Sequence, residues 1–201
     1  MKLSRFLGFI FSSIFAASAF AHSGHLHQES ATNFMEGLQH PFNGLDHFLA
    51  MLAVGIYGAL STSNWRMALR APAGFAVLLL VGALLGLTGF SLPSMEPAIA
   101  ASVLIFGLLI LSRNAFPPLL SKALIGVFAL FHGVAHGSEI PGSASLISAV
   151  FFLAGMLLAT LSLHTFGLFI GQCLRSSVRV IVPVLGSTLA LIGIGLLSQT
   201  L

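Results

Sequence analysis

The sequence predicts an all-α membrane protein, with a cleaved signal peptide followed by about six transmembrane helices in one bundle. Only 6% of its 201 residues are charged, whereas 57% are hydrophobic and the mean hydropathy is +1.03. A soluble domain carries about 25% charged residues, so this chain cannot build a water-facing surface. Its apolar runs are continuous rather than alternating, which favours helices over membrane-barrel strands. These features argue against a soluble enzyme, a disordered protein and a nucleic-acid-binding protein.

Residues 1–21 have the features of a secretory signal peptide. Lys2 and Arg5 precede a short apolar run that leads to the small-residue motif Ala19-Phe20-Ala21, which suits signal peptidase. The run is short for a membrane span, although an uncleaved first transmembrane helix is the alternative. Cleavage would place the mature amino terminus outside the membrane.

The mature chain would begin with a short external segment, residues 22–39, before the transmembrane domain at residues 40–201. Three of the first six residues of this segment are histidines: His22, His25 and His27. They could capture a divalent ion weakly from outside, or they could belong to a polar tail without function.

Six stretches then reach or approach the roughly 20 apolar residues of a membrane span. They are His40–Leu60, Ala71–Phe90, Met95–Leu111, Pro118–Gly137, Ser145–Gly171 and Val178–Ser198. Three pairs of glycines spaced four residues apart predict close packing between these helices. The pairs are Gly82/Gly86, Gly133/Gly137 and Gly167/Gly171.

The basic residues predict the orientation of these spans. With the mature amino terminus outside, every lysine and arginine of the mature chain lies in or beside an internal loop, as the positive-inside rule requires. These residues are Arg66, Arg70, Arg113, Lys122, Arg175 and Arg179. We therefore expect a multi-pass protein of the bacterial inner membrane whose mature amino and carboxyl termini are both periplasmic.

The first span begins with an unusual group of polar residues for a membrane helix. His40 and His47 are seven residues apart and share a face if one helix runs through both. Pro41 suits the first turn of that helix. Asp46 is placed either to contact a ligand or to orient an imidazole. Ionisable groups in membrane spans are costly, and therefore indicate function.

The fourth span ends with a second polar group, which we expect at the same depth. His132 and His136 have the i, i+4 spacing that directs two imidazoles toward one metal ion. Glu139 continues the same face, at the mouth of the span. An antiparallel arrangement would bring both groups together. Imidazole with carboxylate suits Ni²⁺, Co²⁺ or Zn²⁺, whereas a hydrogen-bonded polar core that only fixes helix packing is the alternative.

Two further polar residues are open to more than one interpretation. His164, in the fifth span, is expected to lie deeper in the membrane. It could serve as an inner metal relay, or it could be hydrogen-bonded to Thr160 or to a backbone carbonyl. Glu96 lies near the start of the third span. Its side chain could join the mouth of the metal site, but we expect it to be solvated instead.

At these residues the sequence resembles the HupE/UreJ family of nickel-permease-like membrane proteins. The string HPFNGLDHFLAMLAVG (His40–Gly55) matches the family's H-x5-D-H signature, and FHGVAHGSEIP (Phe131–Pro141) matches its F-H-G-x-A-H-G-x-E signature. The string FFLAGMLLATLSLHTFG (Phe151–Gly167) is also similar. The resemblance covers nearly the whole chain, including the signal peptide.

The resemblance implies a transporter rather than an enzyme, which imports Ni²⁺, or Co²⁺ in some relatives, for hydrogenase or urease maturation. The metal ion is then the substrate, the bilayer is the environment, and no tightly bound cofactor is expected. A homo-oligomer and a metal-delivery partner both remain open. The family's functional residues correspond here to His40, Asp46, His47, His132, His136 and Glu139.

Three rival interpretations follow from the same histidines. An accessory subunit of a metal-import complex would have the same sequence features. A b-type cytochrome subunit would use membrane histidines as haem ligands, but the nearby acids Asp46 and Glu139 argue against it. A zinc metalloprotease is disfavoured because Gly133 replaces the glutamate that follows the first histidine in HExxH.

Overall fold

The computed structural model describes residues 34–112, 115–177 and 179–201, and the regular secondary structure of this part of the chain is all helical, with no strand. The predicted all-α fold is therefore confirmed, while the predicted signal peptide and the three histidines that follow it lie outside the described residues. The elements in chain order are α2 (Phe34–Asn43), α3 (Leu45–Ser61), α4 (Trp65–Ala68), α5 (Arg70–Leu87), α6 (Met95–Ser112), α7 (Pro118–Glu139), α8 (Leu146–Leu174), the 3₁₀ turn η3 (Arg175–Ser177) and α9 (Ile181–Ser198).

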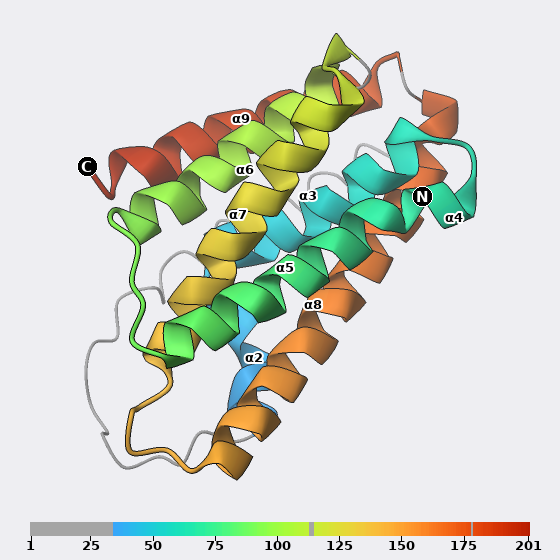
Figure 1. The fold of residues 1–201 in the computed structure, drawn as a ribbon. Helices are drawn as coiled ribbons and strands as arrows, with labels where there is room; N and C mark the ends of the chain where they lie inside the picture. The colour runs from blue at the N-terminus through green and yellow to red at the C-terminus, as the bar shows by residue number, and fades with distance from the viewer. Residues whose placement is uncertain (1–33, 113–114, 178) are drawn as a thin grey trace.

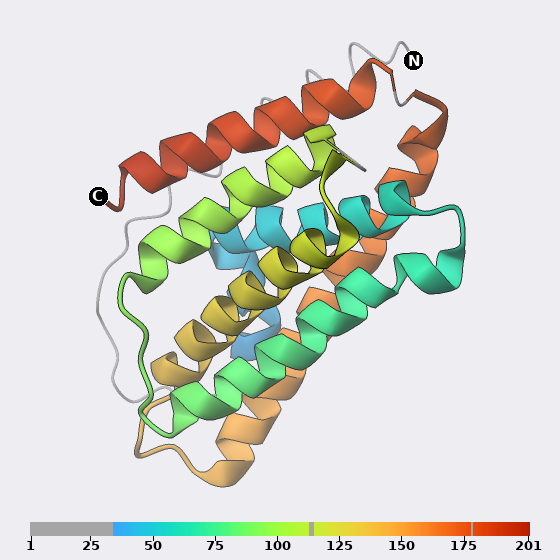
Figure 2. The same ribbon diagram turned by 45° about the horizontal axis from the view of Figure 1, so that its top comes forward.

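The long helices form one bundle with α3 at its centre. Helix α5 packs along α7, α6 packs along α9, and α3 contacts α8, α6 and α5 (Figure 1). Figure 2 shows the pairs α6–α9 and α5–α7 running side by side. Three α3 side chains, Met51, Ala53 and Val54, are fully buried, because this helix has protein neighbours on most sides.

The number of spans agrees with the prediction only if the first one is counted as broken. Within the described residues, five helical segments are long and apolar enough to cross a membrane: Trp65–Leu87, Met95–Ser112, Pro118–Glu139, Leu146–Leu174 and Ile181–Ser198. The pair α2 and α3 passes the same test together but is bent by 87°. The bundle therefore has five such helices, or six if the bent pair forms one span.

The expectation of one continuous helix through His40 and His47 is wrong. Helix α2 begins at Phe34, six residues before the predicted span, and Pro41 lies inside it rather than in its first turn. The helix ends at Asn43, and Gly44 has the extended backbone angles φ −110° and ψ 125°. Proline removes a helical hydrogen bond and glycine weakens helices, so these two residues explain a break here.

The glycine pairs pack two helices against each other, as the sequence predicts. Gly82 of α5 faces the backbone of α7 at Leu130 and Gly133, and Gly133 and Gly137 face the backbone of α5 at Leu79 and Ala83. A β-carbon at any of these positions would collide with main-chain atoms of the other helix. This close contact fixes the position of α7, which carries two of the candidate metal ligands.

Replacing Gly133 by alanine is expected to destabilise the bundle. The added β-carbon would overlap the carbonyl oxygen of Leu79, and overpacking of this kind costs about 1–3 kcal/mol. At Gly126, on the same helix, the nearest atom to an added β-carbon is the mobile end of the Leu78 side chain. Thermal unfolding in detergent should therefore show a clearly lower Tm for Gly133→Ala than for Gly126→Ala. Equal Tm values would contradict the close backbone packing.

The two ends of the bundle differ in chemistry. The end where α3 and α8 finish, which we call the basic end, carries Arg66, Arg70, Lys122, Arg175 and Arg179. There Arg175 donates hydrogen bonds to the carbonyl oxygens of Ala59 and Thr62, which joins the ends of α8 and α3. The opposite end, where α3 begins and α7 finishes, is the histidine end.

Candidate metal centre

Four histidines from three helices meet at the histidine end of the bundle. His40 comes from α2, His47 from α3, and His132 and His136 from α7. The ring centroids lie 4.6 Å apart for His40 and His136, 4.8 Å for His47 and His136, and 5.0 Å for His47 and His132. The two polar groups of the sequence thus lie side by side.

The bend between α2 and α3 places His40 beside His47 even though the two residues share no helix face. Their ring centroids are 6.0 Å apart. Gly44 forms the corner, and an added β-carbon there would lie 2.7 Å from Oδ1 of Asp46 and 3.0 Å from Nδ1 of His47. A larger residue at position 44 would therefore press on these two side chains, although the backbone angles there would accept it.

Asp46 holds the imidazole of His47 in a fixed orientation. Its Oδ1 lies 2.7 Å from Nδ1 of His47 and also accepts a hydrogen bond from the backbone N–H of the same residue at 2.7 Å. The carboxylate therefore favours the tautomer with a proton on Nδ1, which leaves Nε2 with its lone pair. Metal-binding histidines commonly donate their second N–H to a carboxylate. Between the two roles open for Asp46, this geometry favours orientation of an imidazole.

His132 is fixed in a similar way by the backbone. Its Nδ1 lies 2.8 Å from the carbonyl oxygen of Phe128, and a carbonyl can only accept, so Nδ1 carries the proton. Its Nε2 is buried and has no hydrogen-bond partner in the described part of the chain. His47 and His132 thus both present an Nε2 that lacks a partner.

His136 is the most unusual of the four. It is fully buried, and neither of its ring nitrogens has a hydrogen-bond partner among the described residues. A buried polar group without a partner costs about 1–3 kcal/mol. The ring lies against both His40 and His47, so a cation between the three rings would satisfy it.

The closest ligand set differs from the pair that the α7 spacing suggests. Ring nitrogens of His40, His47 and His136 lie within 4.8 Å of one another. The ring centroid of His136 is 4.6 Å from that of His40 but 6.4 Å from that of His132. Two nitrogen ligands of one tetrahedral ion lie about 3.4 Å apart, so the widest gap between these nitrogens would close by up to about 1.4 Å on binding. His132 is not part of this triad, and its ring centroid lies 5.0 Å from that of His47.

Burial increases stepwise from the mouth of the site inward. Glu139 is 51% exposed and lies 3.2 Å from Nε2 of His40, which is 24% exposed. His47 is 14% exposed, and His132 and His136 are fully buried. Glu139 thus lies at the mouth, as the sequence predicts, and the imidazoles lead from it into the bundle.

His164 on α8 lies beyond the cluster and lacks the hydrogen bond considered for it. It is 1% exposed, and neither of its ring nitrogens nor the hydroxyl of Thr160 has a partner in the described residues. Phe75 of α5 contacts the rings of both His132 and His164, at centroid distances of 5.6 and 5.2 Å. Phe75 therefore joins the histidine cluster to His164, a contact that no sequence motif indicates.

Glu96 is exposed in the first turn of α6.

Replacing Gly44 by alanine should damage the centre without removing a ligand. The backbone angles at this position suit alanine, but its methyl group would displace the Asp46 carboxylate or the His47 ring. We expect metal affinity to fall about 10–100-fold, the usual loss when groups that orient metal ligands are disturbed. Equilibrium binding of ⁶³Ni²⁺ to the purified protein measures this. Gly195→Ala, where nothing lies within 4 Å of an added β-carbon, is the control, and parental affinity in Gly44→Ala would contradict the crowding.

The fold and the cluster define a multi-pass helical membrane protein with a histidine-rich centre inside its bundle. The chain belongs to the HupE/UreJ family, because the family model described as "HupE / UreJ protein" matches residues 10–196. A relative, Protein HupE of Rhizobium leguminosarum bv. viciae, is 35% identical over 198 residues, which cover 98% of this chain and 99% of the relative. No solved structure matches the chain. The resemblance seen in the two histidine motifs is confirmed.

Proposed function

We propose that this protein imports a divalent transition-metal ion, Ni²⁺ first and Co²⁺ second, across the bacterial inner membrane as a secondary transporter or facilitator. Its family is associated with nickel and cobalt uptake for hydrogenase or urease. The observation that carries the proposal is the triad of His40, His47 and the buried His136, whose ring nitrogens lie within 4.8 Å of one another and could hold one ion. A purely structural polar core would hydrogen-bond its own members, whereas His136 has no such bond in the described residues.

The different chemistry of the two ends of the bundle supports inward transport. Basic residues face the cytoplasm, so the histidine end would face the periplasm. A divalent ion would meet Glu139 and His40 at the mouth and lose water to His47 and His136. An inside-negative potential would drive it onward by about 4.6 kcal/mol per 100 mV for two charges.

The inner part of the path would run past His132 to His164. Phe75 touches both rings, so an ion that passes from one imidazole to the next requires movement of this phenyl ring. Thr160, one helical turn from His164, adds a hydroxyl oxygen without a partner in the described residues. His164 would be a transit ligand rather than part of the outer centre.

Replacing His164 by leucine is expected to slow transport without weakening metal binding. Leucine fills a similar volume but offers no ligand, and we expect uptake to fall roughly tenfold or more, a barrier increase of at least about 1.4 kcal/mol. Binding of ⁶³Ni²⁺ to the purified variant should match the parental protein because the outer centre is unchanged. Thr165→Val, at the adjacent exposed residue, is the control. A variant that transports at the parental rate would remove His164 from the path.

The proposed function is tested by uptake of ⁶³Ni²⁺ into cells that lack their own nickel importers and express this chain. We expect uptake above the vector control, with unlabelled Co²⁺ competing more strongly than Zn²⁺. Uptake at the vector level, despite insertion in the membrane, would contradict an autonomous importer and favour an accessory subunit of a metal-import complex.

A further inference from the structure

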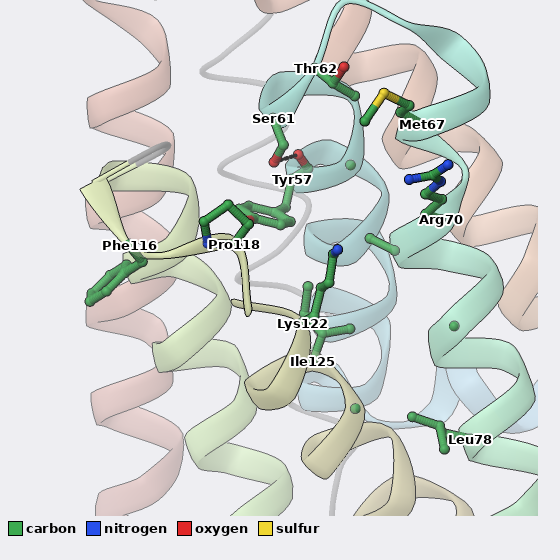
Figure 3. A pocket seen from close by; sticks show the side chains of 14 residues that line it. Tyr57, Ser61, Thr62, Met67, Arg70, Leu78, Phe116, Pro118, Lys122 and Ile125 are labelled. Atoms are coloured by element: carbon green, nitrogen blue, oxygen red, sulfur yellow. Dashed lines mark hydrogen bonds between the residues drawn. The ribbon is translucent and has the colours of Figure 1, made fainter. Parts of the chain in front are cut away.

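A second polar feature lies at the basic end of the bundle, away from the histidines. A cavity of about 600 Å³ opens between the end of α3, the beginning of α5 and the beginning of α7. Figure 3 shows Tyr57, Ser61 and Thr62 of α3 on one side of it, with the side chains of Arg70 and Lys122 facing the same space from α5 and α7.

The charge of the lining suits an anion and not the transported ion. Arg70 and Lys122 both line the cavity, and its 14 lining residues include no aspartate or glutamate. Neither basic residue forms an ion pair with any carboxylate of the described chain. A Ni²⁺ ion would be repelled here, whereas a phosphate group would be attracted by both side chains.

The remaining walls are mainly apolar, which narrows the class of ligand. Met67, Leu78, Ile125 and Phe116 line the cavity, and an added β-carbon at Gly74 would meet nothing within 4 Å. A small soluble anion would leave these walls uncovered. A molecule with a charged head and a hydrocarbon chain would satisfy both parts of the lining.

The position of the cavity identifies the source of such a molecule. It lies where α3 ends and where α5 and α7 begin, the end that the positive-inside rule assigns to the inner headgroup region. Arg175 at the same end is already hydrogen-bonded to backbone carbonyls at the end of α3, whereas Arg70 and Lys122 form no ion pair within the described residues. Basic pockets between helices on the cytoplasmic side are known to hold anionic lipid headgroups.

We propose that this cavity binds an anionic phospholipid of the inner leaflet, with its phosphate between Arg70 and Lys122. Tyr57 and Thr62 also line this cavity. One acyl chain would run along Leu78 and Ile125. Such a lipid would join α3, α5 and α7 at the basic end. Its binding should therefore stabilise the fold whether or not nickel is present.

Thermal unfolding of the purified full chain in uncharged detergent tests this proposal. Added phosphatidylglycerol is expected to raise the Tm by roughly 3–6 °C more than phosphatidylcholine, the rise for a ligand at about ten times its dissociation constant. Inorganic phosphate alone should raise the Tm by about 1 °C or less. Native mass spectrometry of the same samples should show phosphatidylglycerol retained on the protein.

Variants that remove one positive charge test whether phosphatidylglycerol raises the Tm by binding in this cavity. Lys122→Gln and Arg70→Gln should each lose most of the difference between the two lipids, whereas Lys122→Arg should keep it. Arg66→Gln, at the same end but outside the cavity lining, should behave like the parental protein. Equal stabilisation by both lipids, equal loss in Arg66→Gln, or a full effect of phosphate alone would each overturn the proposal. None of these outcomes depends on nickel transport.

Discussion

Replacing His136 by leucine is expected to abolish nickel uptake while leaving the protein as stable as the parent, or more stable. The imidazole contributes no hydrogen bond within the described residues, and both of its nitrogens are buried. Leucine fills a similar volume without a buried polar atom, which removes a cost of about 1–3 kcal/mol. The loss of uptake follows because His136 is the buried member of the triad.

The two effects are measured by ⁶³Ni²⁺ uptake and by thermal unfolding of the metal-free protein. Ser121→Ala is the matched control, because Ser121 lies on the same helix and its hydroxyl is also buried without a partner in the described residues. It should keep uptake and show a similar neutral or higher Tm. A His136→Leu protein that unfolds at a much lower temperature would show instead that the imidazole is structural.

Replacing Asp46 by asparagine is expected to eliminate uptake without preventing membrane insertion. The amide oxygen of asparagine can still accept the hydrogen bond from the backbone N–H of His47, so the start of α3 should be preserved. What is lost is the negative charge beside Nδ1 of His47. This charge favours the tautomer that presents Nε2 and partly neutralises a bound cation.

The expected loss of Ni²⁺ affinity is about 10–100-fold, as for other groups that orient metal-binding histidines. Equilibrium binding to purified protein gives the affinity, and an immunoblot of membranes gives the level of inserted protein. If Asp46→Asn binds and transports Ni²⁺ as the parent does, the carboxylate has no part in the centre.

The sequence was sufficient to predict the all-helical fold and the proximity of the two histidine groups. Long apolar runs leave few alternatives to helices in a bilayer. The glycine pairs predicted close helix packing but did not indicate that α5 and α7 are partners. The bend at Gly44 was not predicted. Pro41 is compatible with the first turn of a helix, and a lone glycine does not reveal whether a helix ends there or continues.

The roles within the site were harder to predict than its members. Spacing on α7 suggested that His132 and His136 share an ion, but the bend between α2 and α3 brings His40 closer to His136 than His132 is. The bond from His132 to Phe128 and the contact of Phe75 with His164 depend on side-chain direction and on tertiary packing. Periodicity along one helix carries no information on either.

The central claim is that this chain alone carries a divalent metal ion through its histidine centre. The most direct test is ⁶³Ni²⁺ entry into liposomes that contain only the purified protein and have an inside-negative potential. We predict uptake that saturates with Ni²⁺, increases with the potential and disappears in His136→Leu. No entry above empty liposomes, or equal entry through His136→Leu, would contradict the claim.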